Sequence, residues 1–364
     1  RIINHALDGI KSSIDDFLID IYRENNNLIT LENAINWIHQ PESMEELNLA
    51  INRLKFDEHF FMQLLMAIKK YNYKKNITDQ FISQDNYVAK IYKQLPFQLT
   101  NSQINVLREI RNDLEKETSM NRLIQGDVGS GKTIVAILAS GIAIDNSTQV
   151  AIMAPTEILA EQHYNSFKSY CSKINLRCEL LISDIKKNLK EDLINDIKSG
   201  DIDIIVGTHA LIQENIKFKN LGLAIIDEQH RFGVEHRKNL ISKAKHPNVL
   251  AMTATPIPRT LSMTIHGDLD VSVINEIPKD RIPIKTQIAH EEKLDSIYDF
   301  IKVQLDKKRQ CYIVYPIIEE SETLDLEAAD TAYENIKNNI YPNYNVGYLN
   351  GKMDKVERDR QMKL

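Results

Sequence analysis

The sequence predicts an α/β protein whose central part is a parallel β-sheet. Short apolar runs alternate with helical stretches from about residue 120 to 265, which is the pattern of a parallel sheet. A glycine-rich turn joins one of these runs to an apolar helical stretch. Polar motifs follow several of the runs directly, and the carboxyl ends of parallel strands form the ligand-binding edge of such a sheet.

The composition sets broad limits on the class of protein. A chain of 364 residues with 43% hydrophobic and 26% charged residues is typical of a globular protein with two to three domains. The net charge of -6 counts mildly against a nucleic-acid partner, because nucleic-acid modules are usually basic. The longest apolar run, Ile134 to Ile144, is too short to span a bilayer, and no secretory leader opens the chain. We therefore expect a cytoplasmic protein without a membrane partner.

Residues 1 to about 70 predict helices, and a polar region that follows them to about Lys93 predicts a domain boundary. Ser43 followed by Glu46 fits a capping box that opens a helix. Apolar residues then recur at helical spacing, and we expect them to pack against each other or a neighbouring domain rather than to form a binding groove: Phe60, Phe61, Leu64, Leu65 and Ile68. The basic stretch 69–75 contains two tyrosines, so it fits a nucleic-acid patch. We favour the alternative, in which these lysines complement the dipole at a helix C-terminus.

The glycine-rich turn is the most informative stretch. Residues 126–133 read GDVGSGKT and match the pattern G-x-x-x-x-G-K-S/T at each fixed position. A β-run, Arg122 to Gln125, precedes the turn, and a helix is predicted to start near Lys132. Such a turn points backbone N–H groups inward and forms an anion cradle with the helix N-terminus. The predicted phosphate-binding residues are Gly126, Asp127, Val128, Gly129, Ser130, Gly131, Lys132 and Thr133.

The side chains of this turn predict ATP and Mg²⁺ as cofactors. Lys132 would place its charge on the β- and γ-phosphates, and the Thr133 hydroxyl would ligate Mg²⁺. Upstream, the amide of Gln103 could pair with the edge of adenine, and Phe97 could stack on the ring. This pair favours ATP over GTP.

A second motif, which is acidic, follows the apolar run Leu223 to Ile226 and reads DEQH. Asp227 can hold Mg²⁺, directly or through water, and Glu228 can act as general base or orient a water molecule. An Asp-Glu pair alone is more often a helix cap. Together with the phosphate-binding turn, the catalytic interpretation is favoured.

Three further motifs follow predicted strands. APTE follows Val150 to Met153, GTHA follows Asp203 to Val206, and TATP follows Val249 to Met252. We expect all of them at one edge of the sheet. From about Ile282 a second, partial α/β unit is predicted, with helices at 291–305 and 326–340 and strands at 311–318 and 346–349.

The motifs together resemble those of superfamily 2 helicases and DNA translocases of the DExH type. GDVGSGKT, APTEILAEQH, GTHALI, DEQH and MTATPIPRT look like helicase motifs I, Ia, Ib, II and III in that order. Longer runs are similar to the RecG family of bacterial ATP-dependent DNA helicases: LPFQLTNSQ, DEQHRFGVEHR, MTATPIPRTLSMTIHGDLDVSVINEIP and IVYPIIEESETLDLEAA. The resemblance is dense from about Leu95 to Met353 and loose before it.

The resemblance implies a domain plan and additional site residues. It implies a helical linker region at 1–92, a RecA-like ATP-binding domain at 93–280 and part of a second RecA-like domain at 281–364. It places Gln229 and His230 in the ATPase centre, as catalytic residues beside Lys132, Asp227 and Glu228. The residues implied to couple nucleotide state to DNA are Gln229, His230, Thr253 and Thr255, and the implied DNA contacts are Thr156 and Thr208. A strand-end cap explains each of these threonines equally well.

The family resemblance also implies an activity. It implies a monomer that uses ATP to move along double-stranded DNA and to remodel branched DNA, such as stalled forks and Holliday junctions, in recombination and repair. In that family a wedge domain precedes this region, and motifs V and VI with an arginine finger follow it. We therefore expect residues 1–364 alone to bind ATP·Mg²⁺ but to hydrolyse ATP poorly.

Two alternatives to this activity stay open. A transcription-repair coupling factor also carries a TATPIPRTL-type motif and would have a different partner. A truncated relative could bind nucleotide without turnover. Against the truncated relative stand four residues that a retired ATPase has no physical need to retain: Lys132, Thr133, Asp227 and Glu228.

Overall fold

The computed structural model describes residues 7, 9, 14–74, 78–82, 84, 86–183, 185–255, 269–276, 284–315, 322–350, 353, 357, 360 and 361. The chain divides into two compact units, Arg1–Arg281 and Ile282–Leu364. Our expected division of the chain at 92/93 and 280/281 stays a prediction.

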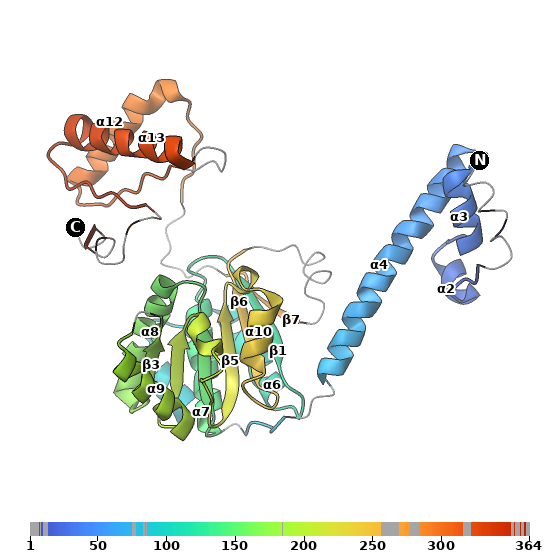
Figure 1. The fold of residues 1–364 in the computed structure, drawn as a ribbon, viewed down its shortest axis with the longest axis horizontal. Helices are drawn as coiled ribbons and strands as arrows, with labels where there is room; N and C mark the ends of the chain where they lie inside the picture. The colour runs from blue at the N-terminus through green and yellow to red at the C-terminus, as the bar shows by residue number, and fades with distance from the viewer. Residues whose placement is uncertain are drawn as a thin grey trace. The chain divides into compact units, whose positions relative to one another are not determined.

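The first unit opens with three helices, α2 (Asp20–Asn25), α3 (Leu31–His39) and α4 (Met44–Lys74), drawn in blue in Figure 1. At the start of α4, the Ser43 hydroxyl accepts the backbone N–H of Glu46 at 3.2 Å, as predicted. The Glu46 carboxylate accepts the N–H of Glu42 at 2.7 Å, so the second half of the predicted capping box is shifted by one residue. With 31 residues, α4 is about 46 Å long.

A buried arginine holds these helices together. Arg53 of α4 has a fully buried side chain, and its guanidinium donates to Asp57 at 2.8 Å and to Asp16 at 2.6 Å. It also donates to the backbone carbonyl of Ile29. Because a buried charge needs partners, Arg53 fixes the segment before α2 and the segment before α3 against α4.

The apolar stripe farther along α4 is largely not packed among the helices of the described residues, and its packing against a neighbouring domain stays a prediction. The side chains of Phe61, Leu64, Leu65 and Ile68 are between 43 and 51% exposed. Only the start of the stripe packs, where Phe17 meets Phe61 with ring centroids 4.6 Å apart. Helical spacing predicted a face that can be buried, but no described element covers most of it.

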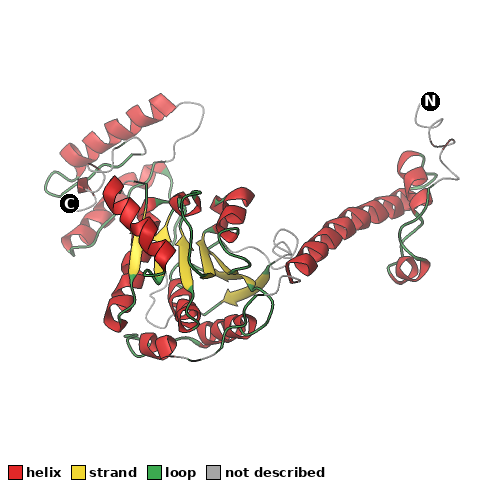
Figure 2. Cartoon of the chain, turned by 60° about the horizontal axis from the view of Figure 1, so that its bottom comes forward, coloured by secondary structure: helices red, strands yellow, loops and turns green. Residues whose placement is uncertain are grey.

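The core of the first unit is a seven-stranded parallel sheet in the order β3-β4-β2-β5-β6-β1-β7, as far as the structure describes it. The parallel α/β prediction is confirmed. Figure 2 shows the strands between helices on both sides. The strands are β1 (Asn121–Gly126), β2 (Gln149–Met153), β3 (Cys178–Leu181), β4 (Ile204–Gly207), β5 (Leu221–Asp227), β6 (Asn248–Thr253) and β7 (Asp270–Ile274).

The central strands are continuous apolar runs because both faces of the sheet are covered. Along β5, Leu223 and Ile225 face one cluster with the buried side chains of α6, α7 and α8, and Ala224 and Ile226 face the other, with Ile197 of α9 and Leu240 of α10. The helices are α5 (Asn86–Tyr92), α6 (Asn101–Leu114), α7 (Lys132–Asp145), α8 (Glu157–Cys171), α9 (Lys187–Ser199) and α10 (Val234–Ile241). Short 3₁₀ helices lie between them: η1 (Ser172–Ile174), η2 (His209–Ile212) and η3 (Gln229–Arg231). None of the described helices has the length and hydropathy that crossing a membrane requires.

The second unit is helical in its described part. It contains η4 (Glu291–Lys293), α12 (Leu294–Asp306), α13 (Glu322–Asn335) and η5, a π-helix (Ile336–Ile340). The strands predicted at 311–318 and 346–349 are wrong where the structure describes them, because residues 311–315 and 346–349 form no strand. Residues 316–318 lie outside the described residues. An apolar run needs a neighbouring strand to become a ladder, and Tyr312 and Val314 are instead exposed.

Candidate nucleotide-binding site

The strand order brings the predicted motifs to one edge of the sheet. β6 lies between β1 and β5, with Gln125 of β1 paired to Thr253 and Asp227 of β5 paired to Met252. Parallel strands end on the same side, so the glycine-rich turn after β1, DEQH after β5 and TAT after β6 are neighbours. Pro256 to Thr260, the rest of the TATPIPRT motif, lie outside the described residues.

The turn after β1 has the backbone that an anion cradle requires. Gly129 and Gly131 have φ angles of +80° and +89°, a region that strongly favours glycine. Gly131 is the N-cap of α7, so the free N–H groups of the first helical turn, starting at Lys132, face the same loop. The Ser130 hydroxyl is buried and has no hydrogen-bond partner in the described structure.

Lys132 folds back onto its own loop. Its Nζ donates to the carbonyl oxygens of Gly126 at 2.7 Å and Asp127 at 3.0 Å. Burial lowers the pKa of Lys132, and the negative charges of Asp227, Glu228 and Asp127 partly oppose this shift. A half-buried ammonium group held only by carbonyl groups is ready to exchange them for an anion.

Gln103 contacts the cradle rather than standing apart from it. Its Oε1 accepts the N–H of Thr100 at 2.9 Å in a capping box, and its Nε2 donates to the carbonyl of Ser130 at 2.8 Å. A Cβ atom on Gly131 would overlap that amide nitrogen. Phe97 is about half exposed. The adenine contacts of Phe97 and Gln103 stay predictions.

The acidic pair lies where β5 ends. The buried carboxylate of Asp227 lies 2.6 Å from Nε2 of His163, a residue of α8. Glu228 follows with φ +47°, a strained value for a residue with a side chain. Its Oε2 lies 3.4 Å from Oγ1 of Thr253 and 3.5 Å from Nδ1 of His230.

The residues expected to couple the site to DNA are connected to this pair. The hydroxyl of Thr253 contacts Glu228 directly, and the hydroxyl of Thr255 lies 2.8 Å from that of Thr253, one hydrogen bond farther from Glu228. Gln229 is 3% exposed, and its Oε1 accepts a long bond of 3.4 Å from Arg237 of α10. The structure thus brings Glu228, Thr253 and Thr255 together.

The two DNA-contact candidates differ in their surroundings. Thr156 is the N-cap of α8, and its hydroxyl accepts the N–H of Leu159 at 3.3 Å. Thr208 follows β4, is buried and makes no capping bond, and its hydroxyl has no partner among the described residues. Thr156 therefore has the capping role that we considered. Its DNA contact and that of Thr208 stay predictions.

Comparisons with known proteins find similar helicases. A model of the DEAD/DEAH box helicase family matches residues 100–264. The ATP-dependent DNA helicase RecG of Synechocystis sp. is 44% identical over 96% of this chain and 42% of its own length, and RecG of Bacillus subtilis is 44% identical over 100% of this chain and 53% of its own length. A solved structure of RecG bound to a three-way DNA junction matches with a TM-score of 0.80 at 36% identity, covering 100% of this chain and 48% of that one.

The chain is similar to RecG along its whole length. It spans about half the length of the RecG relatives that it matches. The fold agrees with this similarity, since the RecG structure aligns over the whole chain.

The cradle fits ATP and Mg²⁺. The Ser130 hydroxyl has no hydrogen-bond partner among the described residues, and the half-buried ammonium group of Lys132 donates to carbonyl oxygens that a phosphate could replace. Among the described residues, no group of three or more His, Cys, Asp or Glu side chains could hold a metal ion by itself. Mg²⁺ suits such a site, because it binds through one or two protein oxygens together with substrate phosphates.

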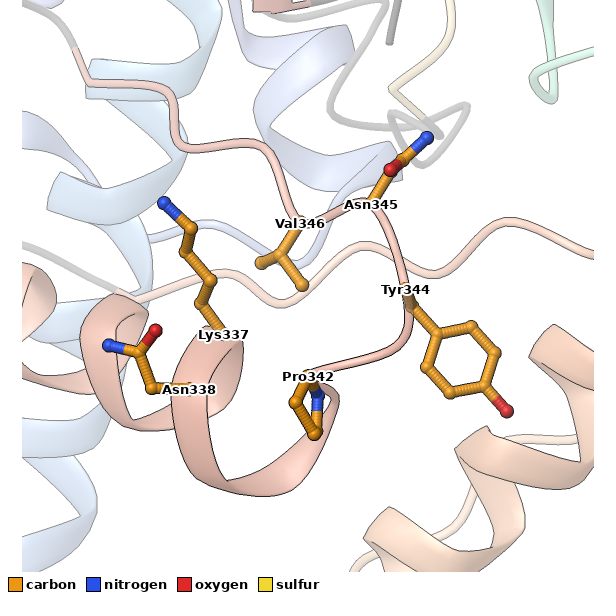
Figure 3. A pocket seen from close by; sticks show the side chains of 6 residues that line it. All are labelled: Lys337, Asn338, Pro342, Tyr344, Asn345 and Val346. Atoms are coloured by element: carbon orange, nitrogen blue, oxygen red, sulfur yellow. The ribbon is translucent and has the colours of Figure 1, made fainter.

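Two surface hollows among the described residues lie away from this cradle. One, of about 310 Å³, is in the second unit and is lined by the residues shown in Figure 3: Lys337, Asn338, Pro342, Tyr344, Asn345 and Val346. The other, of about 750 Å³, lies beside β3 and α9 and includes Arg177, Leu189 and Asp196. Neither is lined by a residue of the glycine-rich turn.

Two residues of the site were missed by the sequence interpretation. His163 contacts Asp227, and Arg237 contacts Gln229. Helical spacing within APTEILAEQH offers a signal for the first, because position 163 falls on the buried face of α8 with Ala160 and Phe167. Nothing in the sequence pairs it with a carboxylate 64 residues away.

Proposed function

We propose that this chain forms the ATP-binding part of an ATP-dependent DNA helicase of the RecG type that acts on branched DNA in recombination and repair. The observation that carries the proposal is the convergence at one sheet edge of the cradle of Lys132, the carboxylates of Asp227 and Glu228, and the hydroxyl groups of Thr253 and Thr255. The RecG relatives and the RecG structure solved with a three-way DNA junction support branched DNA as the substrate.

Triphosphate binding begins with an exchange of partners at Lys132. Its ammonium group leaves the carbonyls of Gly126 and Asp127 for the β- and γ-phosphates, and the N-terminus of α7 takes the same charge. Thr133 and Asp227 would hold Mg²⁺, which when bound neutralises charge that develops on the phosphate oxygens. Phe97 and Gln103 would bind the adenine side of the nucleotide.

Hydrolysis then depends on Glu228. Its carboxylate would orient the attacking water or accept its proton, and Thr253, the backbone N–H of Ala254 and His230 surround its Oε2. Because Thr253 is bonded to Thr255, a change at Glu228 reaches the segment that follows β6. Gln229 and His230 would act beside Glu228, and Thr156 and Thr208 would meet the DNA backbone.

The domain plan belongs to the same proposal. We assign residues 1–92 to a helical linker, 93–280 to the RecA-like ATP-binding domain and 281–364 to part of a second RecA-like domain. Opening and closing of a cleft between two RecA-like domains would move duplex DNA along the protein. The protein would work as a monomer in the cytoplasm.

ATP turnover on defined DNA tests this function. The protein encoded by the complete gene is assayed with Mg²⁺ and either a three-way junction or a linear duplex of equal base-pair content. We expect the junction to stimulate hydrolysis more than the duplex. Glu228→Gln should still bind nucleotide but hydrolyse it at least about 100-fold more slowly. Equal stimulation by both DNAs, or full activity of Glu228→Gln, would contradict the proposal.

A further inference from the structure

An imidazole occupies a position of α8 that packing alone would fill with an apolar side chain. The buried residues of α8 are Ala160, His163, Phe167 and Cys171, which recur every three or four positions along one helical face. The other three need only packing contacts. A polar ring on such a face requires a hydrogen-bond partner, because an unpaired buried donor is costly.

The partner of His163 is the carboxylate of motif DEQH. Nε2 of His163 lies 2.6 Å from Oδ2 of Asp227, and the two side chains are 9% and 11% exposed. At this distance an N–H donor to a carboxylate makes a strong, charge-assisted bond. The bond joins α8 to the end of β5, so it fixes the direction of the carboxylate as well as its position.

We propose that His163 is a positioning residue for the Mg²⁺ site. By donating from Nε2 to Oδ2 of Asp227, it leaves Oδ1 as the oxygen that receives Mg²⁺ or a metal-bound water. Partners of metal ligands commonly hold them in this way, and their loss costs roughly 10- to 100-fold in metal affinity or activity. This inference rests on the proposed nucleotide site and adds a residue that none of the helicase motifs assigns to Mg²⁺.

The same bond connects the Mg²⁺ site to α8, the helix that Thr156 caps. Thr156 caps α8, and His163 lies about two helical turns farther along. A shift of α8 along its axis would therefore change the direction of the Asp227 carboxylate. The bond from His163 therefore links α8, whose N-cap is Thr156, directly to the proposed metal ligand Asp227.

The test compares His163→Leu with His163→Gln in the full chain. Leu fills the space but cannot donate, whereas the Gln amide can place an N–H near the position of Nε2. Binding of a fluorescent ADP analogue is titrated with Mg²⁺ and repeated in EDTA, so the readout is metal-dependent binding rather than turnover. Phe167→Leu is the matched control, because it loosens the same face of α8 without touching Asp227.

We expect His163→Leu to raise the Mg²⁺ concentration at half-maximal binding by about tenfold or more, with metal-free binding unchanged. His163→Gln should remain within about threefold of wild type, and Phe167→Leu should lower Tm without altering the Mg²⁺ titration. If His163→Leu does not fold, His163→Asn replaces it, because its shorter amide does not reach Oδ2, and the same shift is expected.

Two results would overturn the inference, and they differ from each other. An unchanged Mg²⁺ titration in His163→Leu, with wild type binding normally, would remove the role of His163 and leave the nucleotide site intact. Absence of Mg²⁺-dependent binding in wild type would overturn the proposed function and this inference together.

Discussion

At the scale of single residues, Lys132 shows how a site can be unfavourable until its ligand arrives. Its ammonium group is half-buried, its pKa is lowered chiefly by that burial, and its partners at 2.7 and 3.0 Å are carbonyl groups of its own loop. A desolvated charge without a counter-ion adds little to the stability of the free protein. We expect the ammonium group of Lys132 to contribute to stability when phosphate binds.

Lys132→Met should therefore separate stability from binding. We expect the free protein to keep its stability within about 1 kcal/mol, because the removed bonds are offset by the removed desolvation. ADP with Mg²⁺ should raise the Tm of wild type, whose free energy of unfolding gains about 2.7 kcal/mol at a ligand concentration of 100 times Kd. The Tm of Lys132→Met should not rise with this ligand. Calorimetry measures both. Lys190→Met is the control. It removes a lysine of α9 that is bonded to Gln213, and this variant should keep the ligand-induced rise in Tm.

Gly131→Ala should damage the same site through the backbone. At φ +89° a side chain is strained by about 1–2 kcal/mol, and the new Cβ would displace the amide of Gln103. Gly233→Ala is the matched control, since its φ is −63° and a Cβ there meets nothing within 4 Å. We expect denaturant unfolding to show a loss above 1 kcal/mol for the first and a change within about 0.5 kcal/mol for the second. Equal effects would show that the loop does not require its left-handed conformation.

The predictability of the site follows from the range of each interaction. The cradle could be predicted because glycine, lysine and threonine serve needs within one loop of eight residues. Glu228 and Thr253 could be predicted to lie at one edge of the sheet, because each is found where a parallel strand ends. His163 and Arg237 could not, because their partners depend on how α8 and α10 pack against the sheet.

At the scale of elements, the helices before the sheet depend on the buried charge of Arg53. Burial raises the pKa of Asp16, but hydrogen bonds from Arg53 and from the backbone N–H groups of Leu18 and Leu31 outweigh it and bring the pKa down to about 2, from 3.8. A carboxyl group with a lowered pKa stabilises the folded state above its unfolded pKa. That stability is lost as the pH falls from about 4 to 2.

Acidification should therefore loosen these helices first. Trp37 of α3, the single tryptophan, reports on them by fluorescence in the full chain. Asp16→Asn should cost up to about 2 kcal/mol at pH 7 and flatten the loss between pH 4 and 2. Burial raises the pKa of Asp57, which works in the opposite sense and makes the wild-type loss smaller than Asp16 alone would give. Asp20→Asn is the control, because Asp20 is 79% exposed and pairs with Arg23 at the surface. A wild-type curve that stays flat to pH 2 would contradict this account.

The elements that sequence patterns predicted are those with strong local signals. The helix after the glycine-rich turn and the apolar strands β2, β4, β5 and β6 were predicted within a residue or two. β3 and β7 were missed, because CELL and DVSVI are short and carry polar residues at the sheet edges. The strands expected in the second unit failed for the opposite reason, since an apolar run has no ladder without a neighbour.

At the scale of the whole molecule, the order of the strands in the sheet brings the parts of the site together. Because β6 separates β1 from β5, three segments more than a hundred residues apart at their extremes end side by side. Alternating strands and helices predicted a parallel sheet with a ligand at its carboxyl edge, and that prediction is confirmed for the fold. The strand order could not be predicted, because it depends on which of the buried strands pair.

A crystal structure of the full chain with ADP, beryllium fluoride and Mg²⁺ would test the central claim most directly. We expect Nζ of Lys132 to have left the carbonyls of Gly126 and Asp127. It should contact the β-phosphate of ADP and the beryllium fluoride that stands for the γ-phosphate, with the metal near Thr133 and Asp227. A nucleotide bound elsewhere, with Lys132 still on those two carbonyls, would contradict the account.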